Sequence, residues 1–302
     1  MRNPVRLISM EQKSTGLRIA HLSDPHFSKI SYDLKQFLSK RWIGNLNLYL
    51  FRKRSYYTEH LAHLPELIES LKVDSVFITG DFSSTSSKEE FIEGEKFVNA
   101  FKERGLPTFI LPGNHDCYTR SAERKRSFYN VFSLQSLQDT KVESLPLKNG
   151  WWYIGLDCAL ATPPFCSYGY FSEEMEEHLR STLSSIPKEQ NILICNHFPL
   201  FTSRRPNHEL SRAKALQALL RSFPQVKLYL HGHDHHPYII DRQYDGYPLV
   251  LNSGSCAHKP EGMFYLIDLF EKECLVQHLL FRRENQNFFW VIDWQKHYNF
   301  KH

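Results

Sequence analysis

Short apolar, β-branched runs recur along the chain, and segments with helical spacing of apolar residues lie between several of them. Runs of this kind predict buried β-strands. The predicted strands cover residues 17–23, 75–79, 108–111, 152–156, 192–195, 226–230, 249–251, 263–268 and 275–281. The predicted helices cover residues 88–104, 173–184 and 208–222. Strands interleaved with helices favour an α/β layered architecture, and the closely spaced later strands favour a mixed sheet.

The helix predicted at 88–104 carries signals at both of its ends. Ser87 and Glu90 have the spacing of a capping box, in which each side chain bonds to the backbone N–H of the other residue. Gly105 and Pro107 follow the helix and stop it. No repeat or low-complexity linker divides the chain, so we expect a single domain over residues 1–302.

Composition narrows the class of protein only a little. Hydrophobic residues are 41% and charged residues 23% of the chain, which is ordinary for a soluble globular protein. The net charge of +4 is too small to indicate nucleic-acid binding, and we expect no nucleic-acid partner. The six cysteines contain no CxxC pair, which favours thiols in a reducing compartment. The N-terminus lacks the apolar core of a signal peptide, so we expect a cytoplasmic protein. We also expect a monomer.

Polar residues follow the carboxyl ends of five of the predicted strands. The five blocks read Asp24-Pro25-His26, Gly80-Asp81, Gly113-Asn114-His115-Asp116, Asn196-His197 and Gly232-His233-Asp234-His235. One block alone is a weak signal, because a histidine at a strand end is usually structural. Five blocks in this position predict one site, since ligands of open α/β sheets bind beyond the carboxyl ends of the strands. Carboxylate, carboxamide and imidazole together suit Mn²⁺, Fe or Zn²⁺.

The order D-x-H, G-D, G-N-H-D, H, G-H-x-H resembles the calcineurin-like metallophosphoesterase family. The motifs extend from Asp24 to His235, and the flanking strands continue the resemblance to about Asp268. It implies two facing mixed β-sheets flanked by helices, and a centre of two divalent cations, for which we expect Mn²⁺. One cation would be held by Asp24, His26, Asp81 and His235. The other would be held by Asp81, Asn114, His197 and His233, so that Asp81 bridges the two.

The same resemblance assigns roles to residues that hold no metal. His115 would face the substrate and protonate the leaving oxygen, and Asp116 would orient its imidazole. Gly80, Gly113 and Gly232 would let the backbone turn sharply beneath the metals.

Several further polar residues near these strands have weaker claims to the site. Arg204 and Arg205 follow the strand of His197, and a planar guanidinium suits phosphate. His258 and Lys259 are similar candidates. His21 and His231 lie inside predicted strands and are interpreted as structural. His236 lies beyond the last motif, and we expect it to face solvent or to contact a metal ligand rather than a metal.

Residues 34–57 form a basic, aromatic insertion after the first block, which we expect to be helical. Apolar residues that include Trp42, Leu46 and Leu50 recur near helical spacing, with Lys and Arg around them. The segment is too short to span a bilayer. It suits an interfacial helix or a pocket for acyl chains, and it could equally be a cap helix packed on the core.

The C-terminal residues 284–302 are also rich in aromatics. They could form a lipid-binding surface or a terminal strand docked on the core. Because two such segments favour an acylated substrate, the chain resembles most the chlamydial type of enzyme that cleaves UDP-2,3-diacylglucosamine to lipid X and UMP in lipid A synthesis. That resemblance implies an acylated nucleotide-sugar substrate and peripheral contact with the inner membrane.

Two other functions compete with this reading. The nearest alternative is a cyclic-nucleotide or generic phosphodiesterase of the same family, for which the insertion would matter little. A remote alternative is a non-catalytic metal-binding scaffold. That alternative is disfavoured because all seven expected ligands and His115 are present.

Overall fold

The computed structural model describes residues 16–29, 58–201, 206–258, 261–284 and 287–301. A first mixed sheet has six strands in the order β14-β13-β12-β1-β2-β3. Its strands are β1 (Leu17–Leu22), β2 (Ser75–Thr79), β3 (Thr108–Leu111), β12 (Met263–Leu269), β13 (Glu273–Glu284) and β14 (Asn287–Asn299). Strands β1, β2 and β3 are parallel. Strands β12, β13 and β14 follow on the other side of β1, and each is antiparallel to its neighbour.

A second mixed sheet faces the first and has the order β10-β11-β9-β7-β5-β4. Its strands are β4 (Val142–Pro146), β5 (Trp151–Leu156), β7 (Asn191–Cys195), β9 (Val226–His231), β10 (Pro237–Ile240) and β11 (Leu249–Ser253). The four central strands are parallel, and the two edge strands are antiparallel to their neighbours. A separate pair joins β6 (Gly169–Tyr170) to β8 (Leu210–Ser211).

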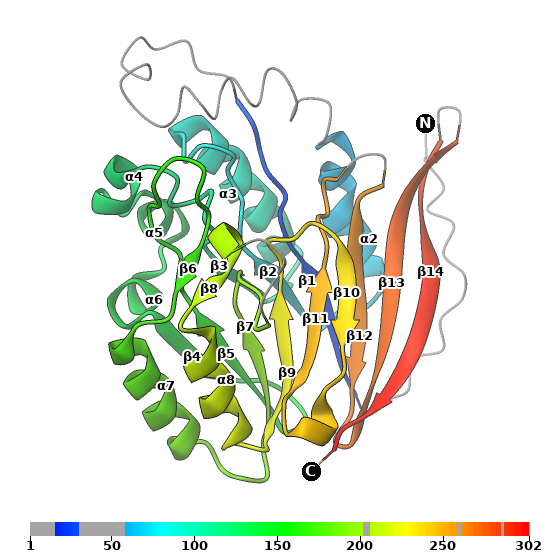
Figure 1. Cartoon of the computed structure of the whole chain (residues 1–302). Helices are drawn as coiled ribbons and strands as arrows, with labels where there is room; N and C mark the ends of the chain where they lie inside the picture. Colours follow the sequence, from blue (N-terminus) through cyan, green and yellow to red (C-terminus); the bar gives the residue numbers. More distant parts are fainter. Residues whose placement is uncertain (1–15, 30–57, 202–205, 259–260, 285–286, 302) are drawn as a thin grey trace.

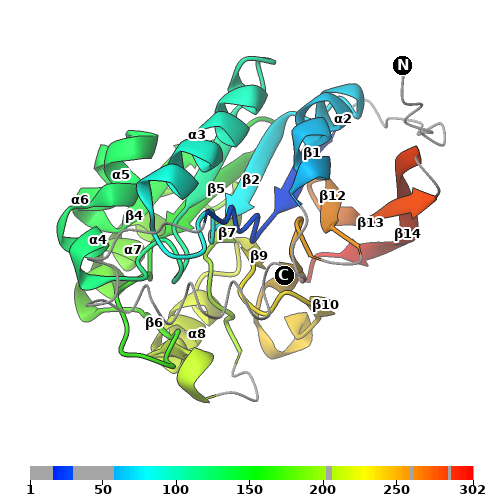
Figure 2. The same cartoon turned by 90° about the horizontal axis from the view of Figure 1, so that it is seen from above.

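Helices cover the outer faces of both sheets (Figures 1 and 2). Those on the first sheet's side are α2 (Leu64–Ser70), α3 (Lys88–Lys102) and α5 (Ser127–Phe132), with α4 (Arg120–Arg124) directly before α5. Helix α6 (Gln135–Thr140) contacts β4, and its Leu137 lies in the core between the two sheets. The helices on the second sheet's side are α7 (Glu173–Ser185) and α8 (Ala213–Arg221). Short 3₁₀ turns lie at η3 (Glu59–His63), η4 (Pro206–His208) and η5 (Gln243–Asp245). The layered fold expected from the sequence is therefore confirmed.

The sandwich has three layers of apolar packing. Side chains alternate along each strand, so β1 points Ile19 between the two sheets and Ala20 and Leu22 toward the helices α2, α3 and α5. A third core lies between the second sheet and the helices α7 and α8. Because both faces of the central strands are buried, these strands are continuous apolar runs rather than alternating ones.

The capping box predicted at the start of α3 is present. The Ser87 side chain accepts from the backbone N–H of Glu90, and the Glu90 carboxylate accepts from the backbone N–H of Ser87. The helix then buries an apolar face that includes Phe91, Val98 and Phe101. Local capping and core packing thus agree on where this helix begins.

The helix predicted at 208–222 begins later than expected, at Ala213. Residues 206–208 form a 3₁₀ turn, and Leu210–Ser211 pair with β6 instead of coiling. Arg212 then takes a left-handed φ of 63°, which starts the helix afresh. A long-range strand pair therefore overrides the local helical pattern. The edge strands β4 and β10 and the short helices α2, α4, α5 and α6 were also absent from the prediction.

The C-terminal aromatic segment is a docked strand, which is one of its two predicted readings. Strand β14, at the edge of Figure 1, pairs with β13 from Asn299 opposite Glu273 to Asn287 opposite Glu284. Trp290 packs against Phe264 and Phe281 in the core. Of the aromatic side chains described in residues 289–300, none is exposed. Their packing stabilises this edge of the sheet, and a lipid-binding surface at this segment stays a prediction.

Residues 34–57 lie outside the described part of the chain, so their interpretation as an interfacial or cap helix stays a prediction. Within the described ranges, no helix combines the length and the apolar character needed to cross a membrane.

Candidate metal centre

The carboxyl ends of parallel strands from both sheets meet at one edge of the sandwich. Asp24 and His26 follow β1, and Asp81 follows β2. His197 follows β7 of the facing sheet, and His233 and His235 follow β9. Two hydrogen bonds join the loop after β1 to the loop after β2. The backbone N–H groups of Asp24 and His26 donate to the carbonyls of Gly80 and Asp81 at 3.1 and 3.0 Å.

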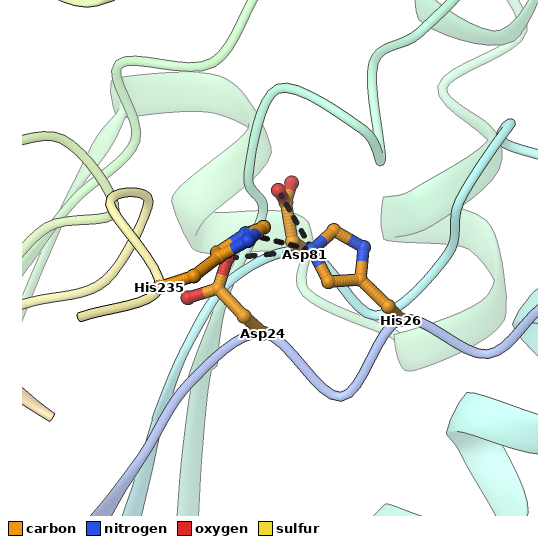
Figure 3. A group of neighbouring side chains, drawn as sticks. All are labelled: Asp24, His26, Asp81 and His235. Carbon is orange, nitrogen blue, oxygen red and sulfur yellow. Dashed lines mark hydrogen bonds and ion pairs between the residues drawn. The ribbon is translucent and has the colours of Figure 1, made fainter. Parts of the chain in front are cut away.

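The first predicted ligand set is assembled as expected (Figure 3). Asp24, His26, Asp81 and His235 each offer one ligand atom, and these atoms all lie within 4.8 Å of one another. His235 Nε2 is 3.0 Å from His26 Nε2 and 3.1 Å from Asp24 Oδ1. Two ligands bound at about 2.1 Å to one cation are about 3.0–3.4 Å apart, so these atoms have the spacing of a coordination shell.

The second set converges on the same carboxylate. His197 Nε2 lies 3.1 Å from Asn114 Oδ1, 3.2 Å from His233 Nδ1 and 3.5 Å from Asp81 Oδ2. The same Asp81 Oδ2 lies 3.7 Å from His26 Nε2 of the first set. Asp81 therefore stands between the two sets, as the bridging role requires. The donors present fit a pair of divalent cations.

Hydrogen bonds behind the ligands select the ring nitrogen that each histidine offers. His197 Nδ1 donates to the carbonyl of Thr79 at 2.7 Å, which leaves Nε2 facing the second set. His233 Nε2 donates to the carbonyl of His208 at 2.9 Å, which leaves Nδ1 for the same set. Backbone partners of this kind hold ligand histidines in one tautomer. His208 was missed in the sequence, where its position inside a predicted helix carried no signal of this role.

The site is strongly polarised. Burial opposes ionisation of Asp24, but the imidazoles of His235, His26 and His197 outweigh it and hold the pKa of this carboxyl well below its usual range. Burial likewise opposes ionisation of Asp81, and His197 leads the groups that lower its pKa. Both buried carboxylates therefore stay ionised among imidazoles, which is the charge pattern that suits bound cations.

Five of the seven predicted ligands have left-handed backbone conformations. Their φ angles are 54° at Asp24, 46° at His26, 55° at Asp81, 74° at His233 and 58° at His235. Each such residue other than glycine costs about 1–3 kcal/mol, and such costs are tolerated mainly at functional sites. The loops thus bring these side chains together at the cost of unfavourable backbone conformations.

The three glycines of the motifs are explained in two ways. Gly80 has a φ of 93°, so it makes the sharp turn that was predicted. Gly113 and Gly232 have no left-handed φ, and close approach explains them instead. A Cβ on Gly113 would overlap the Asp81 carboxylate, and one on Gly232 would overlap the Ser23 hydroxyl and the Asp24 carboxylate.

This packing predicts the effect of Gly232→Ala. The new methyl group should displace Asp24 and lower both the metal content and the turnover, by about 10- to 100-fold in rate if the disturbance matches loss of a supporting contact. Metal analysis and a phosphodiesterase assay on the purified protein would measure both. Gly150→Ala is a control for a loss of stability away from the site, because its φ of 77° strains an alanine but nothing lies within 4 Å of the added Cβ. Unchanged metal content in Gly232→Ala would mean that Asp24 can shift without leaving its set.

His115 lies at the border of the first set, and its expected role toward the substrate stays a prediction. Its ring centroid is 5.1 Å from that of His26. Its Nδ1 donates to the carbonyl of Ser84 at 2.8 Å, so a proton passed to a substrate oxygen would come from Nε2. This geometry permits proton donation to a leaving group.

Asp116 does not orient the His115 imidazole through its carboxylate, contrary to expectation. Its Oδ1 accepts from the backbone N–H of Ser83 at 2.8 Å, and its Oδ2 accepts from those of Phe82 and Gly113 at 3.1 and 3.0 Å. Burial, with a further contribution from Asp81, raises the pKa of Asp116 to about 7, and these hydrogen bonds oppose the increase. Asp116 joins the loops after β2 and β3, and the orienting partner of His115 Nδ1 is a backbone carbonyl.

The other candidates fall into two groups. Burial lowers the pKa of His21 to about 3 and that of His231 to about 4, so both are neutral structural histidines, as interpreted. His236 is exposed and His258 half-buried beside it. The remaining candidates lie outside the described residues and stay predictions; they are Arg204, Arg205, Lys259, Trp42, Leu46 and Leu50.

The fold and the paired ligand sets define a metal-dependent phosphoesterase. Residues 17–237 match the sequence profile of the calcineurin-like phosphoesterases, so the chain belongs to this family. It is thus a hydrolase acting on phosphoester bonds.

Curated relatives are identical to this chain at about a quarter of the aligned positions. The 3′,5′-cyclic adenosine monophosphate phosphodiesterase CpdA of Haemophilus influenzae is 27% identical over 67% of this chain and 69% of its own length. A 3′,5′-cyclic-nucleotide phosphodiesterase of Nostoc is 27% identical over 59% of this chain and 62% of its own length. A probable glycerophosphodiester phosphodiesterase of Arcobacter nitrofigilis is 29% identical over 54% of this chain and 57% of its own length.

Solved structures confirm the architecture. A dimetal phosphatase from Danio rerio superposes with a TM-score of 0.66 at 14% identity, covering 91% of this chain and 98% of that one. The purple acid phosphatase PPD1 of yellow lupin superposes with a TM-score of 0.57 at 13% identity, covering 93% of this chain and 54% of that one. At these identities the likeness concerns the fold.

Proposed function

We propose that this chain is a dinuclear-metal phosphodiesterase whose substrates are 3′,5′-cyclic nucleotides. The observation that carries the proposal is the pair of ligand sets that share Asp81, with the His115 ring beside them. Relatives named as cyclic-nucleotide phosphodiesterases support the substrate class. We propose Mn²⁺ as the metal, because the mixed oxygen and nitrogen ligands suit it.

The residues of the chain divide the chemistry between them. Two divalent cations, when bound, supply charge neutralisation for the phosphoryl group and an activated water. Asp81 lies between the two ligand sets, and the backbone hydrogen bonds of His197 and His233 fix which ring nitrogen of each histidine faces them. The Nε2 of His115 gives its proton to the leaving oxygen as the phosphorus–oxygen bond breaks. In a cyclic nucleotide this leaving oxygen is a ribose oxygen.

Cleavage of UDP-2,3-diacylglucosamine to lipid X and UMP is the second candidate. It depends on the basic, aromatic segment 34–57 of the sequence. The other segment that favoured it is weaker support, because Trp290 and Tyr298 are buried in the core. We therefore place this reaction, and the peripheral contact with the inner membrane that it implies, after cyclic-nucleotide hydrolysis.

A substrate panel tests the choice. With Mn²⁺ present, we expect cyclic AMP or cyclic GMP to be converted to nucleoside monophosphate, and UDP-2,3-diacylglucosamine in detergent to release little UMP. We expect the rates to fall by about 10²–10⁴-fold in His115→Ala, which identifies the general-acid chemistry rather than a contaminant. Liquid chromatography of the nucleotide products measures both reactions in one assay.

Replacement of Trp42, Leu46 and Leu50 by Ser is the matched control in the same panel. Under the proposed function, cyclic-nucleotide turnover should stay near that of the unmodified chain. Rapid UMP release that is lost in this variant, together with no cyclic-nucleotide turnover, would overturn the proposal in favour of the acylated substrate. Equal losses on all substrates would indicate that the segment supports the fold.

A further inference from the structure

Five consecutive hydroxyl residues, Ser83 to Ser87, form the loop between Asp81 and helix α3. All five are buried, with exposed fractions of 0–3%. Burial of a hydroxyl group is unfavourable unless the group is hydrogen-bonded. A continuous buried run therefore indicates that these side chains hold something in place, and the loop lies against His115.

Ser86 makes the most specific of these contacts. Its Oγ donates to the backbone carbonyl of His115 at 2.8 Å and accepts from the backbone N–H of Tyr118 at 2.8 Å. The Ser86 hydroxyl thus binds both ends of the segment from residue 115 to residue 118, and Ser83 Oγ also donates to the His115 carbonyl, at 3.0 Å. Nearby, the backbone carbonyl of Ser84 accepts from His115 Nδ1 at 2.8 Å.

The side chains at the two ends of that segment are stacked. The rings of His115 and Tyr118 have centroids 5.4 Å apart and planes inclined by only 8°. The His115 ring also lies against the His26 ring of the first ligand set, with centroids 5.1 Å apart and planes inclined by 82°. Any movement of the backbone held by Ser86 would therefore change where His115 Nε2 points relative to that set.

The loop from Ser83 to Ser87 has an unfavourable backbone conformation at Ser86. Ser86 has a left-handed φ of 57°, which a residue other than glycine rarely adopts. The buried Glu90 carboxylate keeps the loop there, because it accepts from the backbone N–H groups of Thr85 and Ser87 at 2.9 and 3.1 Å. Strain of this kind is concentrated at functional sites.

We propose that Ser86 is a positioning residue that aims the His115 imidazole at the leaving oxygen of the substrate. It acts through His115 and touches neither substrate nor metal. The inference rests on the phosphodiesterase chemistry proposed above, in which the Nε2 proton of His115 moves to the departing oxygen. It does not depend on which phosphodiester is the natural substrate.

Leaving-group dependence tests the proposal on the metal-loaded full chain. Methyl phenyl phosphate expels a poor leaving group that needs a proton, and methyl 4-nitrophenyl phosphate expels one that leaves without it. We expect Ser86→Ala and Ser86→Gly to lower kcat for the first substrate by about 10- to 100-fold and for the second by less than about 3-fold. Metal content should not change. The glycine variant relieves the backbone strain, so equal losses in both variants attribute the effect to the hydroxyl.

Two comparisons make the result decisive. Ser87→Ala removes the neighbouring hydroxyl, which caps α3, and should lower thermal stability without changing kcat on either substrate. In a His115→Ala background, Ser86→Ala should cause no further loss, because a residue that acts only through His115 has nothing left to position.

Equal losses on both substrates, or full additivity with His115→Ala, would overturn the positioning role. If His115→Ala depends on the leaving group and Ser86→Ala does not, the positioning role alone fails. If His115→Ala itself shows no such dependence, the general-acid step of the proposed function fails and the role of Ser86 fails with it. Absence of cyclic-nucleotide turnover would bear only on the natural substrate.

Discussion

Asp81→Ala should remove metal from both ligand sets. One carboxylate oxygen of Asp81 lies 3.7 Å from His26 Nε2 and 3.5 Å from His197 Nε2, so its loss takes a ligand from each set at once. Loss of an outer partner of a metal ligand costs about 10–100-fold in affinity or activity, and loss of a shared ligand should exceed that. Metal analysis of the purified protein after dialysis gives the content per chain, and we expect less than one equivalent.

Asn114→Ala provides the comparison for this variant. Asn114 belongs to the second set alone, through its oxygen 3.1 Å from His197 Nε2. We expect this variant to keep the first metal and lose the second. Asp81 also accepts from the backbone N–H of His115 at 2.8 Å, so metal content rather than rate is the decisive readout for Asp81→Ala. Two retained metals in Asp81→Ala would disprove the bridge.

His115→Ala should keep both metals and lose most of the turnover. The imidazole belongs to neither ligand set, so the metals have no reason to leave. Removal of a general acid costs about 10²–10⁴-fold on a substrate with a poor leaving group. Steady-state rates with cyclic AMP, taken beside the metal content of the same preparation, check both expectations.

The half-buried His178 on helix α7, which belongs to neither ligand set, offers a control for this substitution, and His178→Ala should leave the rate unchanged. Near-normal turnover of cyclic AMP by His115→Ala would assign proton transfer to another group or to water. Loss of metal together with loss of rate would instead mean that His115 supports the ligand loops, which the bond from its Nδ1 to the Ser84 carbonyl could explain.

Local sequence was sufficient where a structural feature depends on residues close together in the chain. The capping box of Ser87 and Glu90 lies within one helical turn, and its prediction was confirmed. The buried strands were visible because each is a short apolar run. The start of α8 was not visible, because Leu210–Ser211 pair with β6, whose residues lie about forty positions earlier in the chain.

The predicted ligands could be collected from the sequence for a related reason. Each block directly follows a strand, and parallel strands bring their carboxyl ends to one edge. What could not be predicted were contacts made through backbone carbonyls. Every residue has such a group, so no letter of the sequence marks Ser84 as the partner of His115 or His208 as the partner of His233.

By itself, then, the sequence determined the class of fold, the order of the metal-binding blocks and the chemistry that these residue types permit. The tertiary structure decided which atoms meet: that Asp81 stands between the two sets, that Asp116 joins loops instead of orienting His115, and that the C-terminal aromatics pack inward. The physical reason is that residue types and their periodicity are local properties of the chain. Distances, backbone angles and hydrogen-bond partners arise only when two sheets pack face to face.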